Sequence, residues 1–153
     1  MALMAASTNS VWLRRLAIFP VLLLAMATRA SLPPPAKFSP AREVALVCNA
    51  TGAQNLHPAT TSAQVCSAFK RQFDAALGRD THVATRAPAS GDVVSVALHI
   101  PGPRGASAAV TTRAGGVSAR WPEISVDVMD KPLEISEIGQ LATQVARTIM
   151  QGI

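Results

Sequence analysis

The chain has 153 residues, of which 49% are hydrophobic and 4% aromatic, and its formal net charge is +5. This length suits a single folding domain. The basic residues are dispersed, and too few aromatic side chains are present to stack against bases, so the composition argues against nucleic-acid binding.

The first 27 residues have the pattern of a secretory signal peptide. Arg14 and Arg15 precede an apolar run over residues 16–27, which closes with the small-residue sequence Ala-Met-Ala. A basic start, a short apolar core and a small-residue exit are the three parts of such a signal. The run is shorter than the ~20 apolar residues that a spanning helix needs, so we expect cleavage after Ala27 or Ala30. An uncleaved anchor is the alternative, and the paired arginines loosely fit a twin-arginine signal.

Residues 28–41 form a proline-rich linker in this interpretation, and residues 42–153 form a single domain. The sequence Ser-Leu-Pro-Pro-Pro within the linker favours an extended polyproline conformation. Removing Arg14 and Arg15 leaves 12 basic residues against 9 acidic ones, a net charge of +3. A charge this small says little about partners. The predicted location is periplasmic or secreted.

Cys48 and Cys66 are the only two cysteines. In an oxidising compartment two lone cysteines usually pair, so we predict an intramolecular disulfide. Two buried free thiols are one alternative. A metal site is another, but it needs further ligands at short spacing, and only His57 lies near the pair in sequence. We therefore expect neither a metal nor a cofactor.

The segment from Arg42 to Cys48 is predicted to be the first strand, and a helix follows it. Thr61 and Gln64 fit a capping box, which opens a helix by satisfying its first amides. The apolar residues that follow recur at the spacing of one helix face, and Gly78 fits a left-handed C-cap. This face consists of Val65, Cys66, Phe69, Phe73, Ala76 and Leu77. The predicted disulfide would therefore pin the first strand to the first turn of this helix.

Three further strands are predicted over residues 92–100, 106–113 and 117–129, after a short edge strand at 82–85. Turns rich in glycine and proline separate the three strands. The face of these strands that carries small and polar residues is expected to meet solvent. It consists of Ser95, Ala97, His99, Ser107, Ala109, Thr111, Arg113 and Arg120.

The alternation of apolar residues predicts the register of these strands. Val96 falls opposite Val110, and large residues then meet small ones along the pair. Beyond Trp121 the apolar alternation shifts by one residue, and a proline follows at once. We therefore predict a one-residue bulge at Pro122-Glu123.

A final helix is predicted after Pro132, with Ser136 as its N-cap and Glu137 in its first turn. Its inward face consists of Ile138, Leu141, Ala142, Val145 and Ile149, and Gly152 ends it. The element order is β-α-β-β-β-α. The predicted fold class is α+β: a two-layer sandwich in which an antiparallel β-meander carries two helices on one face. The place of the first strand in the sheet stays open.

His99 is the histidine with the most suggestive surroundings. The register places it opposite Ser107, and a serine beside a histidine suggests a nucleophile and its base. The sequence has no G-x-S-x-G motif, no acid is expected within reach, and a mid-strand serine lacks oxyanion donors. We therefore interpret His99 as an exposed strand residue and assign no catalytic residue.

Glu123, Asp127 and Asp130 form the second candidate group. Paired carboxylates can perform acid–base chemistry, but residues four apart on a strand lie about 13 Å apart at ~3.3 Å per residue. That separation is too large for a glycosidase pair. The glycine loops at 101–105 and 113–116 lead into strands rather than helices, so they indicate hairpin turns and not phosphate sites.

The sequence therefore predicts an exported, non-catalytic accessory or binding module of the cell envelope. Its partner is an unidentified protein or envelope component, with no nucleic acid and no permanent transmembrane anchor. Two alternatives remain. One is a small secreted hydrolase that uses His99 or the acids between Glu123 and Asp130, and the other is a structural subunit of an envelope complex.

Overall fold

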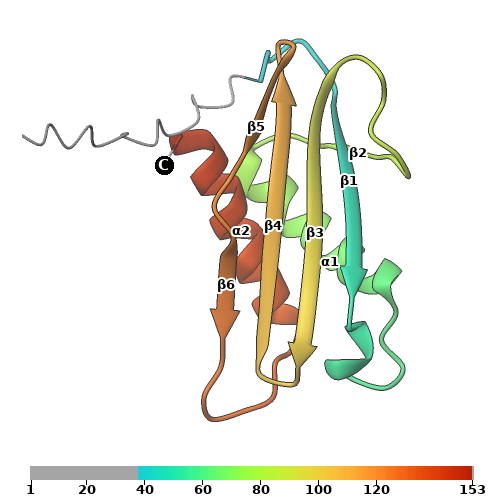
Figure 1. Cartoon of the computed structure of the whole chain (residues 1–153), viewed down its shortest axis with the longest axis vertical. Helices are drawn as coiled ribbons and strands as arrows, with labels where there is room; N and C mark the ends of the chain where they lie inside the picture. Colours follow the sequence, from blue (N-terminus) through green and yellow to red (C-terminus); the bar gives the residue numbers. More distant parts are fainter. Residues whose placement is uncertain (1–37, 153) are drawn as a thin grey trace, which may run out of the picture. The chain divides into compact units, whose positions relative to one another are not determined.

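The computed structural model describes residues 38–152, which form a six-stranded sheet with two α-helices on one of its faces (Figure 1). In chain order the elements are β1 (Val44–Thr51), a 3-10 helix (Ala53–Asn55), α1 (Ser62–Leu77), β2 (His82–Val83), β3 (Asp92–Gly102), β4 (Gly105–Ala114), β5 (Val117–Arg120), β6 (Ile124–Asp127) and α2 (Ile135–Gln151). The predicted α+β class and the order of its main elements are confirmed. The signal peptide predicted at 1–27 and most of the linker predicted at 28–41 lie outside the described residues.

The sheet is mixed, so the predicted antiparallel meander is wrong for its first strands. β1 pairs in parallel with β2 on one side and with β3 on the other, whereas β4 pairs antiparallel with β3, β5 and β6. Parallel neighbours need a long crossover, and residues 52–91, which contain α1, supply it between β1 and β3. The ladder with β3 extends from Val44 to Thr51, so β1 continues beyond the end predicted at Cys48.

Gly52 ends β1 because the chain passes close to β3 at this point. Its φ is +78°, a left-handed conformation that glycine adopts without strain, and a Cβ here would lie 2.1 Å from Ile100 O. Asn55 Nδ2 donates to the same carbonyl oxygen over 2.7 Å. The turn after β1 is thereby fixed to the end of β3.

The edge strand opposite β1 contains the predicted bulge. Thr112 lies opposite Ala119 and Ala108 lies opposite Ile124, so four residue steps on β4 face five steps on the edge strand. The extra residue divides the strand predicted over 117–129 into β5 and β6. Trp121 stays buried at the bulge and donates its Nε1–H to Thr112 Oγ1 over 2.9 Å. This hydrogen bond satisfies the polar end of the buried indole.

The core lies between the sheet and the two helices. Phe69 and Phe73 of α1 stack with their ring centroids 5.8 Å apart. The residues predicted on the inward helix faces are buried, except Cys66, Ala76 and Leu77, which are half-buried. The largest fully buried side chains include Phe69, Phe73, Leu46, Leu98, Ile100, Leu133, Ile138, Leu141 and Ile149. Because both helices lie on the same side of the sheet (Figure 1), no helix within residues 38–152 covers the opposite side. No helix between residues 38 and 152 is long and apolar enough to cross a membrane.

α1 has the predicted ends. Thr61 and Gln64 form its capping box, and Gly78 closes it in the left-handed conformation. The buried carboxylate of Asp74 in the last turn accepts hydrogen bonds from the Thr81 N–H over 3.2 Å and from the Thr81 hydroxyl over 2.7 Å. These bonds fix the direction in which the chain leaves α1 toward β2.

α2 begins two residues earlier than expected, at Ile135, and the predicted Ser136 cap is wrong. The N-cap is Glu134, whose N–H donates to the Glu137 carboxylate over 2.9 Å. Ser136 lies inside the first turn and donates its hydroxyl to the same carboxylate over 3.0 Å. Lys131 Nζ also lies 2.6 Å from Glu137 Oε1. The Glu137 carboxylate therefore contacts the N–H of Glu134, the hydroxyl of Ser136 and the ammonium of Lys131, and it holds the start of α2 in place.

The Glu137 carboxyl makes stability depend on pH. Its pKa is lowered from 4.5 to about 2, chiefly by the hydrogen bond from Lys131, although burial opposes the shift. A carboxyl with a depressed folded-state pKa stabilises the fold above its unfolded pKa, and this contribution is lost as the pH falls. We therefore expect the free energy of unfolding to fall between pH 4.5 and 2, and to fall less for Glu137→Gln than for the wild type.

Urea denaturation at a series of pH values measures this difference. Asp130→Asn is the control because Asp130 is exposed and forms no ion pair within residues 38–152, and it should keep the wild-type pH dependence. A Glu137→Gln protein with the wild-type pH dependence would show that the Lys131–Glu137 contact does not stabilise the fold.

Candidate functional site

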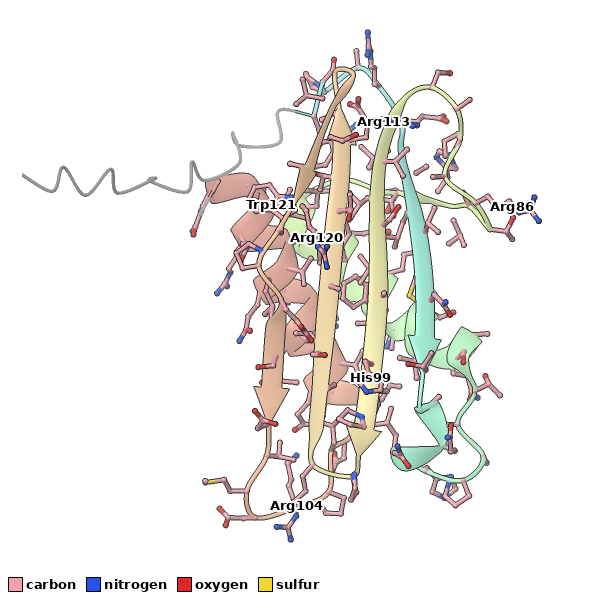
Figure 2. The ribbon with its side chains drawn as sticks, in the orientation of Figure 1. Arg86, His99, Arg104, Arg113, Arg120 and Trp121 are labelled. Atoms are coloured by element: carbon pink, nitrogen blue, oxygen red, sulfur yellow. A yellow bond between two sulfur atoms is a disulfide. The ribbon has the colours of Figure 1, made fainter. Side chains whose placement is uncertain are left out.

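The face of the sheet away from the helices carries the side chains that were predicted to meet solvent. His99 lies opposite Ser107 in the β3–β4 ladder, as the register predicted. The predicted residues of this face are all exposed or half-buried: Ser95, Ala97, His99, Ser107, Ala109, Thr111, Arg113 and Arg120. We call this surface the open face (Figure 2).

Arg113 hydrogen-bonds to the loop between β2 and β3 at one end of the open face. Its Nε donates to Gly91 O over 3.3 Å, and its Nη2 donates to Pro88 O. Ala45 and Val93 share this face by strand parity, and both are buried at this end. The Arg113 guanidinium thus holds the β2–β3 connection in place through two backbone carbonyls, and its role is structural.

His99 has polar neighbours but no catalytic arrangement around it. Its Nδ1 lies 3.1 Å from Thr51 Oγ1 on β1, and Ser107 is its cross-strand neighbour. Within residues 38–152 no carboxylate forms an ion pair with His99. Strand order also places β4 between His99 and the acids near β6. The serine and the histidine are therefore brought together without an acid to orient the ring.

The second candidate group stays apart from the first. Glu123 lies in the bulge, Asp127 ends β6 and Asp130 lies in the loop beyond it, and all three are exposed. These residues are thus placed along one edge of the sheet rather than around a common point.

Metal binding has no support between residues 38 and 152. In that range no three His, Cys, Asp or Glu side chains lie close enough to share an ion. Both cysteine sulfurs form a disulfide with each other, so neither is a free thiolate ligand. His57 Nδ1 accepts the Ala59 N–H over 3.2 Å in its own loop.

The predicted Cys48–Cys66 disulfide is confirmed. It joins β1 to the first turns of α1, with the two Cα atoms 5.8 Å apart. Ser62 Oγ adds a second link by donating to Ala50 O over 2.7 Å. Closing a loop of 18 residues removes unfolded-state entropy worth about 3 kcal/mol.

A groove of about 280 Å³ lies beside this disulfide. Its lining includes both cysteines, Ala50, Ala63 and Val83. The groove exists because β2 pairs only with Ala45 and Leu46, so no described strand covers the rest of β1 on this side. Small apolar side chains beside an uncovered strand edge are suited to binding another polypeptide. We call this surface the β1 groove, and it is the candidate functional site.

Sequence reasoning missed the β1 groove. The available signals were the shortness of the strand predicted at 82–85 and the position of Cys66 at the start of its helix. Neither signal could place Val83 in the same groove as Cys48, because that arrangement depends on β1 pairing in parallel with β2. Parallel pairing between a strand and a two-residue segment leaves no periodic pattern in the sequence.

The sequence matches no family model and no curated protein. Its fold resembles solved structures. A variant of the PelC dodecamer from Paraburkholderia phytofirmans has 14% identity and a TM-score of 0.53, over 78% of this chain and 94% of that one. A protein described only as uncharacterised has 12% identity and a TM-score of 0.47, over 78% and 94%. A Xanthomonas campestris protein of the DUF330 family has 9% identity and a TM-score of 0.39, over 78% and 91%. The likeness to the PelC structure supports a shared fold and nothing beyond it.

The exposure of His99 predicts that it matters little for stability. We expect His99→Ala to change the free energy of unfolding by no more than about 0.5 kcal/mol, as for other exposed substitutions. Urea denaturation at neutral pH measures the change. Hydrolysis of ester or peptide substrates by the purified protein, abolished in His99→Ala at unchanged stability, would instead establish the secreted hydrolase.

Proposed function

We propose that the protein is an exported, non-catalytic module of the cell envelope that acts by binding protein surfaces. The observation that carries this proposal is the Cys48–Cys66 disulfide within a domain that follows a signal-like segment. Disulfides persist in oxidising compartments and are rare in the cytosol. Two independent features of the chain therefore support a location in the periplasm or outside the cell.

The arrangement of polar residues favours binding over catalysis. The His99–Ser107 pair, the acids from Glu123 to Asp130 and the β1 groove lie on three different parts of the surface. Catalysis needs its nucleophile, base and charge-stabilising groups within a few ångströms of one reacting atom. An uncovered strand edge and an open sheet face are instead surfaces on which another polypeptide can lie.

Copies of the same chain are the partner that we propose. The PelC structure that shares this fold is described as a dodecamer. Assembly into such an oligomer would make this protein a structural subunit of an envelope complex, which is the finer form of the proposed function. In such an oligomer the open face and the β1 groove would contact neighbouring copies rather than a small-molecule ligand.

N-terminal sequencing of the processed protein tests export. The full chain, produced in a bacterial host with an intact secretion system, should be recovered from the periplasm or medium and should begin near Thr28 or Ser31. Leu23→Arg is the matched control, because a charge in the apolar core of a signal opposes export; this variant should stay in the cytoplasm and retain its N-terminus. A wild-type protein that stays in the cytoplasm and starts at Met1 would contradict the proposal.

A further inference from the structure

We propose that copies of this chain join head to tail, with the β5–β6 edge of one copy against the β1–β2 edge of the next, and with Arg86 and Glu123 paired across the contact. This inference rests on the self-assembly proposed above. It identifies the two surfaces that meet and the charge pair that sets their register.

The β1 groove supplies one half of the contact. Leu46 O accepts the Ala84 N–H from the β2 side, and backbone groups of alternate residues point to the same side of a strand. The N–H and C=O groups of Cys48 therefore point into the groove, beyond the last residue that β2 pairs with. Ala50 O on the same side already accepts a hydrogen bond from Ser62. Cys48 is thus the point at which a neighbouring chain can bond to the backbone of β1.

The β5–β6 edge supplies the other half. β6 pairs only with β4, so its outer side carries no described partner strand. Ile124, Val126 and Val128 alternate along this edge and are only partly buried against the core. Their exposed portions offer apolar surface to a groove whose lining includes leucine, alanine and valine side chains and the disulfide, beside three polar residues, Asn49, Ser62 and Ser67.

Strand direction makes these two edges compatible. β1 is parallel to β3, β3 is antiparallel to β4, and β4 is antiparallel to β6, so β1 and β6 run the same way. A second copy in the same orientation would therefore place its β6 parallel to β1 and its helices on the same side of the joined sheet. Such a contact uses two different surfaces, and it closes into a ring when the rotation between copies allows.

The distribution of charge favours this head-to-tail contact over a contact between two identical edges. Glu123, Asp127 and Asp130 are exposed near β6, and within residues 38–152 none of them forms an ion pair. Two β6 edges placed together would bring these carboxylates against each other, which is unfavourable. Arg86, on the opposite edge, is exposed and also forms no ion pair in that range. Arg86 and Glu123 thus carry opposite charges on opposite edges of the sheet.

Arg86 and Glu123 also lie at similar levels along the strand direction. Figure 2 shows Arg86 protruding from the β1–β2 edge at about the level of Trp121 on the other edge. Glu123 follows Trp121 by two residues and lies in the bulge between β5 and β6. A copy shifted sideways without sliding along the strands therefore brings Arg86 toward Glu123 of its neighbour.

Native mass spectrometry and light scattering of the exported protein test the contact. The wild type should be oligomeric, and Arg86→Glu and Glu123→Arg should each shift it to monomer because like charges then meet. The double variant R86E/E123R restores opposite charges, so it should recover the wild-type oligomer. Arg147→Glu, an equal charge reversal on the exposed side of α2, is the control and should stay oligomeric. Circular dichroism should show the wild-type secondary structure in all four, whereas the melting temperature should fall only in the variants that become monomers.

Each other outcome overturns part of the account. An oligomer that neither Arg86→Glu nor Glu123→Arg disturbs would keep the self-assembly and exclude this contact. Monomers from both single variants, with no recovery in the double variant, would exclude the Arg86–Glu123 pair. A wild-type protein that is monomeric at all concentrations would exclude self-assembly itself and leave export untouched.

Discussion

The parallel pairing of β1 with β3 is the constraint on which the rest of this structure depends. Parallel neighbours cannot be joined by a hairpin, so the chain must leave β1, cross the sheet and return to begin β3. α1 makes that crossing, and α2 packs beside it against the strands that follow. Both helices therefore cover one face of the sheet, and no described helix covers the other face (Figure 1). The crossover contains β2, a two-residue edge strand that pairs only with Ala45 and Leu46, so no described strand covers the rest of β1 on that side.

Local bonds hold that crossover at both of its ends. The Cys48–Cys66 disulfide and the Ser62–Ala50 hydrogen bond tie the start of α1 to β1, while Asp74 and Thr81 fix the exit from α1 toward β2. Loop-closure entropy is the cost that a parallel pair must overcome, and a covalent bond across the loop reduces that cost. The disulfide that stabilises the crossover therefore also forms part of the lining of the β1 groove.

The sequence predicted what depends on local periodicity and missed what depends on distant pairing. The β3–β4 register and the bulge after Trp121 follow from side-chain parity over short stretches, and the disulfide follows from the pairing of two lone cysteines in an exported chain; the structure confirms all three. Parity cannot show which strand lies beside β1, so the parallel arrangement and the β1 groove were not foreseen. The cap of α2 was placed at Ser136 because serine is a preferred N-cap residue. Glu134 takes that position because Glu137, held by Lys131, accepts its N–H.

The central claim is that this domain works in an oxidising compartment with its two cysteines joined. The most direct measurement is the intact mass of the protein recovered from its native cells, after alkylation under denaturing, non-reducing conditions. The account predicts no alkyl label on Cys48 or Cys66, and two labels once the sample is reduced before alkylation. Two labels without reduction would show free thiols in the native compartment and would contradict the account.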